Sequence, residues 1–263
     1  MTFAAEGKGA EGKGAEGKDS APRDQFSESE LVRYDQQLSI SGWDETHQLR
    51  LRDASVFVVG LGALGSPVTA YLAGAGVGRL GLIDGGDVDL PELYRQFLHY
   101  TPEVETGKAE SAAAKVALLN PNTRIDMFPA DVDASNVDMI LDGANLVIDC
   151  TRDATARGLL SQSCVRTQTP LLALTASGLV AHTAAYLPGQ SVCIECAFSG
   201  LVTPAEPPFG PVSGVIGSIA ALGAIKLIAD LGPVNGTRIL SYDAGQQEIS
   251  RSASTRRPDC SCT

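Results

Sequence analysis

Short apolar runs alternate with longer helix-forming segments along most of this 263-residue chain. The runs are of strand length and rich in β-branched residues, and the segments between them are rich in Ala and other helix formers. This alternation predicts βαβ units and a parallel sheet. The expected strands are 54–60, 78–86, 124–132, 144–151 and 170–178, and the expected helices are 66–77, 108–120 and 152–165.

The pattern changes after Gly178. Residues 179–189 and 237–253 have the character of longer antiparallel strands, and they flank an apolar helix at 214–231. We therefore expect an α/β fold, in which a Rossmann-like, mostly parallel sheet is extended by antiparallel strands.

The first 26 residues are of low complexity, with AEGK repeated three times. Such a composition cannot build a core. We expect residues 1–26 to be a disordered tail and residues 27–263 to form one domain. The first helix should begin at Ser27, because Ser27 and Glu30 have the spacing of a capping box.

A glycine motif joins the first expected strand to the following helix. Gly60, Gly62 and Gly65 have the spacing G-x-G-x-x-G, which allows a tight turn, a close approach of a phosphate and close packing of helix on strand. Asp84 ends the next strand, where a ribose-binding acid is expected. The motif predicts a nucleotide site, with a turn that binds no ligand as the alternative, and leaves open which nucleotide binds.

Two close pairs of cysteines lie in the last third of the chain. Cys193 and Cys196 form C-x-x-C, and Cys260 and Cys262 form C-x-C. In a reducing compartment, this arrangement indicates a structural Zn²⁺ bound by four thiolates, with free thiols or a redox pair as alternatives. Such a zinc site would join the C-terminal tail to the loop after residues 179–189.

The charge balance limits the class of partner. The chain has 20 basic and 31 acidic residues, which argues against nucleic acid or an anionic membrane surface and fits a small-molecule or small-protein substrate. No apolar secretory segment is visible at the N-terminus, and Ser218 and Lys226 interrupt the apolar helix. We therefore expect a cytoplasmic protein without a membrane span.

Further basic residues follow the second expected strand: Arg95, beside Gln96, and Lys108 at a helix start. Together with the glycine motif and the cysteine pairs, they make the chain resemble the ThiF/MoeB/HesA family, the bacterial relatives of ubiquitin-activating enzymes. The resemblance extends from about Leu31 to the C-terminus. It rests on the motifs RYDQQ, VVGLGALGS, GLIDGGDVDLPELYRQF, GKAESAAAKVALLNPN, VIDCTRDATAR and GVIGSIAALGAIK, in this order.

The resemblance implies a reaction that consumes ATP with Mg²⁺. Members of this family adenylate the C-terminal carboxylate of a small ubiquitin-like protein that ends in Gly-Gly, often a sulfur carrier. They are commonly homodimers, and a heterodimer with an intact relative is the alternative here. By the same resemblance, Arg95 and Lys108 are catalytic and face the phosphates. The implied nucleotide-binding residues are Gly60, Gly62, Ala63, Gly65, Asp84, Gln96 and Asp153.

Several positions depart from the family pattern. Gln36 replaces an Arg that helps to hold phosphate, Gly86 replaces one of two acids, and Glu92 replaces a common Asn. Arg152 stands where the family has an Asp linked to Mg²⁺, which reverses the local charge. Asp153, one residue later, could substitute only if the turn shifts.

The expected crossover segment, residues 197–215, contains no cysteine. Many relatives carry a nucleophilic cysteine there, so we do not expect a covalent thioester at this place. The favoured interpretation is an adenylyltransferase without a crossover-loop cysteine. The alternative is a degenerate family member that binds a carrier protein or a partner subunit without adenylating, and a third, an NAD(P) oxidoreductase, does not account for the series of motifs.

Overall fold

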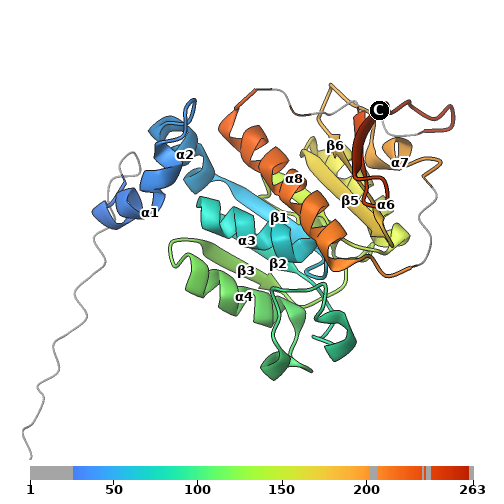
Figure 1. Ribbon diagram of the computed structural model, residues 1–263. Coiled ribbons are helices and arrows are strands. Elements are labelled where there is room, and N and C mark those ends of the chain that lie inside the picture. Colours follow the sequence, from blue (N-terminus) through green and yellow to red (C-terminus); the bar gives the residue numbers. More distant parts are fainter. Residues whose placement is uncertain (1–25, 202–205, 233, 235–237, 261–263) are drawn as a thin grey trace, which may run out of the picture.

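Eight strands form one sheet (Figure 1). The computed structural model describes residues 26–201, 206–232, 234 and 238–260. The strand order is β3-β2-β1-β4-β5-β6-β7-β8, parallel from β3 to β5 and antiparallel from β5 to β8. This confirms the mostly parallel sheet with an antiparallel extension. The strands are β1 (Ser55–Val59), β2 (Arg79–Ile83), β3 (Arg124–Phe128), β4 (Leu146–Asp149), β5 (Leu171–Ser177), β6 (Val180–Tyr186), β7 (Arg238–Asp243) and β8 (Glu248–Ala253).

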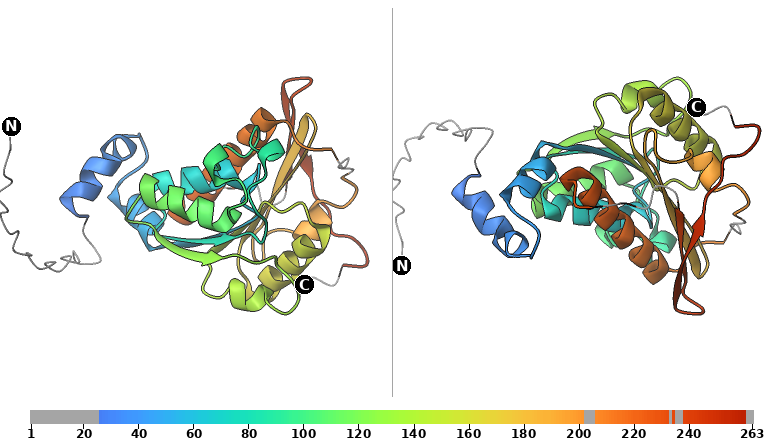
Figure 2. Two further views of the ribbon diagram at one scale, coloured as in Figure 1. Left: turned by 90° about the horizontal axis from the view of Figure 1, so that it is seen from below. Right: turned by 90° about the horizontal axis from the view of Figure 1, so that it is seen from above.

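Helices cover both faces of the sheet (Figure 2). Alternate residues of β1 enter two separate cores: Val56 and Val58 pack in the core under α3, α4 and α8, and Phe57 and Val59 in the core under α5, α6 and α7. A strand buried on both faces is therefore continuously apolar. The helices are α3 (Gly65–Ala75), α4 (Lys108–Leu119), α5 (Val137–Ile140), α6 (Ala154–Thr167), α7 (Ile194–Ala197) and α8 (Gly210–Ala229).

Two further helices, α1 (Glu28–Leu38) and α2 (Glu45–Asp53), precede the sheet, beyond the end at which β1 begins (Figure 1). The capping box of Ser27 and Glu30 is present, as predicted. The short polar helix α2 was not anticipated. The Phe26 ring lies 6.5 Å from that of Tyr34, centroid to centroid, so the ordered chain reaches into the expected tail of residues 1–26, whose other residues lie outside those described.

Helix α8 is long and apolar enough to cross a membrane by length and composition alone. In this fold it packs against α3 and the sheet. A Cβ at Gly217 would lie 2.4 Å from Cγ of Pro67, so the backbone of α8 packs directly on a side chain of α3. These contacts place α8 in the core, and its start at Gly210 is four residues earlier than expected.

The expectation of one long strand over residues 237–253 is wrong. Strands β7 and β8 form a hairpin, with a turn in which the backbone N–H groups of Gly245 and Gln246 donate to Oδ1 of Asp243. Gln247 has a φ of 56°. Asp243 and Gly245 are typical turn residues, and this signal was missed in the sequence analysis.

Candidate nucleotide-binding site

The sheet order reverses between β1 and β4, which is where an open α/β sheet binds its ligand. A cavity of about 330 Å³ lies there, at the carboxyl ends of β1, β2 and β4. This strand-end cavity brings together nearly all of the predicted nucleotide-site residues; Gly65 is the exception. Those that line it are Gly60, Gly62, Ala63, Asp84, Arg95, Gln96, Lys108 and Asp153, together with Glu92, Asp131 and Arg152.

The glycine loop has the geometry that its spacing predicts. Gly60 has a φ of 89°, which favours glycine. A Cβ at Gly65 would lie 2.0 Å from the carbonyl oxygen of Gly60, so this position tolerates no side chain. At Gly62 a Cβ would approach Nε2 of Gln96 to 3.3 Å. Gly65 therefore supports the loop by packing against Gly60 outside the cavity, while Gly60 and Gly62 face the cavity.

Asp84 ties the end of β2 to this loop. Its Oδ2 accepts a hydrogen bond from the N–H of Leu61 at 2.7 Å, and its Oδ1 accepts from the N–H of Gly86 at 2.8 Å. Each carboxylate oxygen keeps a further lone pair for a ligand hydroxyl. Asp84 thus lies where a ribose-binding acid was expected and also orients the glycine loop.

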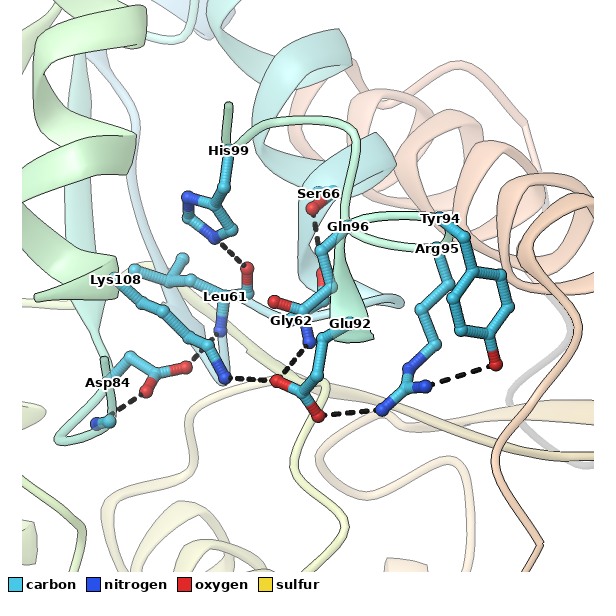
Figure 3. Close-up of polar contacts among 11 residues, drawn as sticks. Leu61, Gly62, Ser66, Asp84, Glu92, Tyr94, Arg95, Gln96, His99 and Lys108 are labelled. Carbon is cyan, nitrogen blue, oxygen red and sulfur yellow. Dashed lines mark hydrogen bonds and ion pairs between the residues drawn. The ribbon is translucent and has the colours of Figure 1, made fainter. Parts of the chain in front are cut away.

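Three polar side chains of the cavity converge on Glu92 (Figure 3). Its Oε1 lies 2.6 Å from Nη2 of Arg95, and its Oε2 lies 2.8 Å from Nζ of Lys108 and 2.7 Å from Nε2 of Gln96. The two cations are mostly buried, with 9% of the Arg95 side chain and 14% of the Lys108 side chain exposed. The cavity therefore contains two cations that jointly hold one carboxylate.

Local structure explains this convergence. Glu92 ends the short 3₁₀ helix Leu90–Glu92, and the turn continues so that Arg95 and Gln96 stand on its side of the backbone. Burial raises the pKa of Glu92, but the hydrogen bond and charge of Lys108, with Gln96 and Arg95, outweigh burial and hold the pKa below its usual value. Glu92 is therefore an ionised partner of the cation pair, a role that the sequence analysis missed.

Arg95 is also linked to the segment that precedes α8. Its Nη1 donates to the hydroxyl oxygen of Tyr94 at 3.0 Å, and that hydroxyl donates to the carbonyl oxygen of Pro208 at 3.3 Å. Pro208 itself lines the cavity. The crossover segment and the cation pair therefore share one wall of the site.

The loop after β4 holds the most marked departure from the family pattern. Asp149 is fully buried and accepts a hydrogen bond from Nε of Arg157 at 2.6 Å. Burial nevertheless raises the pKa of Asp149 against the effect of that guanidinium. Oδ1 of Asp153 accepts from the N–H of Thr155 at 2.7 Å and caps α6. Arg152 is exposed at the rim of the cavity, with no hydrogen bond or ion pair to the described part of the chain.

His99 is a second feature that sequence reasoning missed. Its Nε2 lies 2.9 Å from the carbonyl oxygen of Leu61, and its Nδ1 lies 2.8 Å from Oγ of Ser111. A carbonyl only accepts, so Nε2 donates to Leu61 and carries the proton of the neutral ring. Burial lowers the pKa of His99, which favours this neutral form. His99 thereby fixes the glycine loop to α4.

Gln36, which replaces the phosphate-binding Arg of the family pattern, does not line this cavity. It is exposed on α1, where its Nε2 donates to Oδ2 of Asp35 at 3.2 Å. Figure 1 shows α1 beyond the end of the sheet at which β1 begins, whereas the cavity lies at the opposite strand ends. Gln36 therefore contributes nothing to the site of its own chain.

Three of the four predicted zinc ligands form a cluster. The Sγ atoms of Cys193, Cys196 and Cys260 all lie within 4.8 Å of one another, and those of Cys193 and Cys260 are 3.7 Å apart. Four thiolates at about 2.3 Å from a tetrahedral Zn²⁺ would be about 3.8 Å apart, so the spacing fits a metal better than a disulfide. Cys262 lies outside the described residues.

The sequence model of the ThiF family matches residues 34–263. The chain belongs to the ThiF family. Among curated relatives, the molybdopterin-synthase adenylyltransferase of Salmonella typhimurium is 34% identical over 242 residues, which cover 90% of this chain and 97% of that protein. The heterocyst protein HesA of Trichormus variabilis is 32% identical, with 88% of each chain covered.

This ThiF-family chain is also similar to longer proteins. It is 34% identical to the adenylyltransferase and sulfurtransferase MOCS3 of Drosophila virilis, with 91% of this chain covered. The chain spans 56% of that relative's length. Among solved structures, E. coli MccB has a TM-score of 0.80 at 21% identity, covering 91% of this chain and 76% of MccB. At that identity the likeness shows the fold alone.

Proposed function

We propose that this ThiF-family chain is an adenylyltransferase. It uses ATP to adenylate the C-terminal carboxylate of a small ubiquitin-like or sulfur-carrier protein that ends in Gly-Gly. The observation that carries the proposal is the cation pair: Arg95 and Lys108 lie beside the glycine loop and already hold an anionic group between them. Membership of a family with adenylyltransferase relatives supports it.

The cavity residues would have separate roles in binding the nucleotide and in catalysis. Gly60, Gly62 and Ala63 bring the loop backbone close to the phosphates, and Asp84 meets the ribose. A carrier carboxylate oxygen attacks the α-phosphorus, the bond to the β-phosphate oxygen breaks, and pyrophosphate leaves. Arg95 and Lys108 stabilise the charge that develops on this leaving group.

The donor set of the cavity suits the Mg²⁺ that the family uses. Mg²⁺ is usually held by one or two carboxylates together with substrate phosphates. Asp153 lines the cavity, and its Oδ2 has no hydrogen-bond partner among the described residues. This side chain would hold Mg²⁺, which would neutralise phosphate charge and offset the repulsion between the anions.

We infer that Cys193, Cys196, Cys260 and Cys262 hold a structural Zn²⁺ in a closed site. We also infer a homodimer, in which α1 reaches the partner's cavity. The absence of cysteine from residues 197–215 supports a reaction without a thioester at that segment. We expect the reaction to take place in the cytoplasm.

Pyrophosphate exchange with Mg²⁺·ATP and a panel of Gly-Gly-ending carriers tests this proposal. Exchange that depends on a carrier supports adenylation. If no carrier supports exchange and calorimetry detects no ATP binding, the proposal is wrong. Carrier binding without exchange would instead favour the degenerate alternative. The substituted residues that support this alternative are Gln36, Gly86, Glu92 and Arg152.

A further inference from the structure

We propose that Glu92 is a built-in stand-in for phosphate, which must leave the cation pair before a polyphosphate can bind. Glu92 thereby sets the affinity of the site for its nucleotide. The inference rests on the proposed function in one respect: the ligand is taken to be the phosphate chain of a nucleotide.

Glu92 occupies a donor on each cation of the pair. Each of its carboxylate oxygens already receives a charged donor, Arg95 on Oε1 and Lys108 on Oε2. A phosphate forms charge-assisted hydrogen bonds with the same two cations, at similar distances. Two anions at one cation pair repel each other, so phosphate and carboxylate compete.

Gln96 gives an independent sign that this is a resting arrangement. Only 3% of Gln96 is exposed, it lines the cavity, and its Oε1 has no hydrogen-bond partner among the described residues. Its Nε2 donates a hydrogen bond to Glu92. A purely structural network would be expected to satisfy this buried acceptor. Departure of Glu92 frees the amide to turn toward a ligand.

Glu92 is also the member of the cluster best placed to move. Its side chain is 26% exposed, more than that of either cation, and it ends a three-residue 3₁₀ helix at the surface. Lys108 is held at the start of α4, and its N–H donates to the carbonyl oxygen of Gly86 at 2.8 Å. The carboxylate can therefore swing outward while the cations stay.

The chain offers two matched controls. Glu103 forms a second ion pair with a lysine of α4, Lys115, and neither residue lines the cavity. Asp131 does line the cavity, but its carboxylate is exposed and bonds to none of the described residues. Glu103→Gln thus tests the general effect of losing such a pair, and Asp131→Asn tests the loss of one charge near the site.

Calorimetric titration with inorganic pyrophosphate, without metal, measures the competition directly. Glu92→Gln should bind pyrophosphate about tenfold tighter than the wild type or more, because the cations no longer have to be released. Glu103→Gln and Asp131→Asn should change the affinity much less. Glu92→Asn gives a second variant should Glu92→Gln fold poorly, as judged by circular dichroism.

Several results would overturn the inference. These are an unchanged affinity in both Glu92 variants, an equal gain in Asp131→Asn, or no pyrophosphate binding by any variant. The outcome is separate from that of the exchange assay. Tighter pyrophosphate binding by Glu92→Gln, without carrier-dependent exchange in the wild type, would support the role of Glu92 and refute adenylation. Carrier-dependent exchange with an unchanged pyrophosphate affinity in Glu92→Gln would support adenylation and refute the role of Glu92.

Discussion

Gly65 and Gly60 approach each other so closely that a Cβ on Gly65 would lie 2.0 Å from the carbonyl oxygen of Gly60. The start of α3 therefore packs directly on the turn that leaves β1. This contact sets the backbone of the glycine loop, and Asp84 and His99 hold the same loop through Leu61. The candidate nucleotide site thus depends on Gly65, a residue that does not itself line the cavity.

Gly65→Ala should accordingly disturb both stability and nucleotide binding. The added methyl group forces a backbone shift, for which we expect a loss of about 1–3 kcal/mol in the free energy of unfolding. Gly74→Ala, on the same helix with open space around it, should instead stabilise by up to about 1 kcal/mol. Urea unfolding and ATP calorimetry measure both effects. Equal stability of the two variants would contradict the packing argument.

Lys108→Ala should abolish most carrier-dependent exchange. Removing a preorganised positive charge that stabilises the leaving group typically lowers the rate by a factor of about 100 or more. Lys115→Ala, on the same helix but outside the cavity, should retain most of the activity. The measurement is the exchange rate at saturating ATP, with thermal melting as a check on folding. If both lysine variants lose activity equally, Lys108 has no special role.

Stability should fall as the pH drops below about 6.5, in part because of His99. Burial lowers the pKa of His99 in the folded protein. The unfolded chain therefore takes up a proton at a pH where the folded chain does not, and the free energy of unfolding falls by up to about 1.4 kcal/mol per pH unit. His99→Gln should remove this component. Urea unfolding across that pH range tests it, and parallel curves for wild type and variant would contradict it.

The cysteine cluster should hold about one zinc per chain. The Cys193→Ser variant should not retain the metal. Loss of the metal should expose the segment after β8 to proteases, because Cys260, a member of the cluster, lies in that segment. Cys164→Ala changes a buried cysteine that is not in the cluster and should keep the zinc. Metal analysis and limited proteolysis test this. A wild-type protein with well under one zinc per chain would refute the site.

Much of the fold could be predicted from local pattern, because the central strands of the sheet are short and mostly apolar. The strand at Ser55–Val59 and its glycine turn are an example. The helix at Glu45–Asp53 escaped notice because it is short and polar, with only Gln48 and Leu51 buried. Its capping residue Asp44 was the available signal.

The site was predictable residue by residue but not as a network. Spacing predicted Gly62 at the site because Gly62 lies in the turn after a strand, whereas only the family resemblance implied Lys108, at the start of a later helix. The pairing of Glu92 with Lys108 joins residues sixteen positions apart, and no local pattern specifies such a contact. The spacing of Glu92 to Arg95 and Gln96, three and four residues, was the one available clue.

The most direct test of the account is the covalent product itself. The protein, Mg²⁺·ATP and a Gly-Gly-ending carrier are mixed with inorganic pyrophosphatase, and the intact mass of the carrier is measured at once. We expect the carrier to gain the mass of an AMP group at its C-terminus. No gain is expected with Lys108→Ala, or with a carrier that lacks its last glycine. An unchanged carrier mass across the panel, under conditions in which ATP binds, would contradict the claim that this site adenylates.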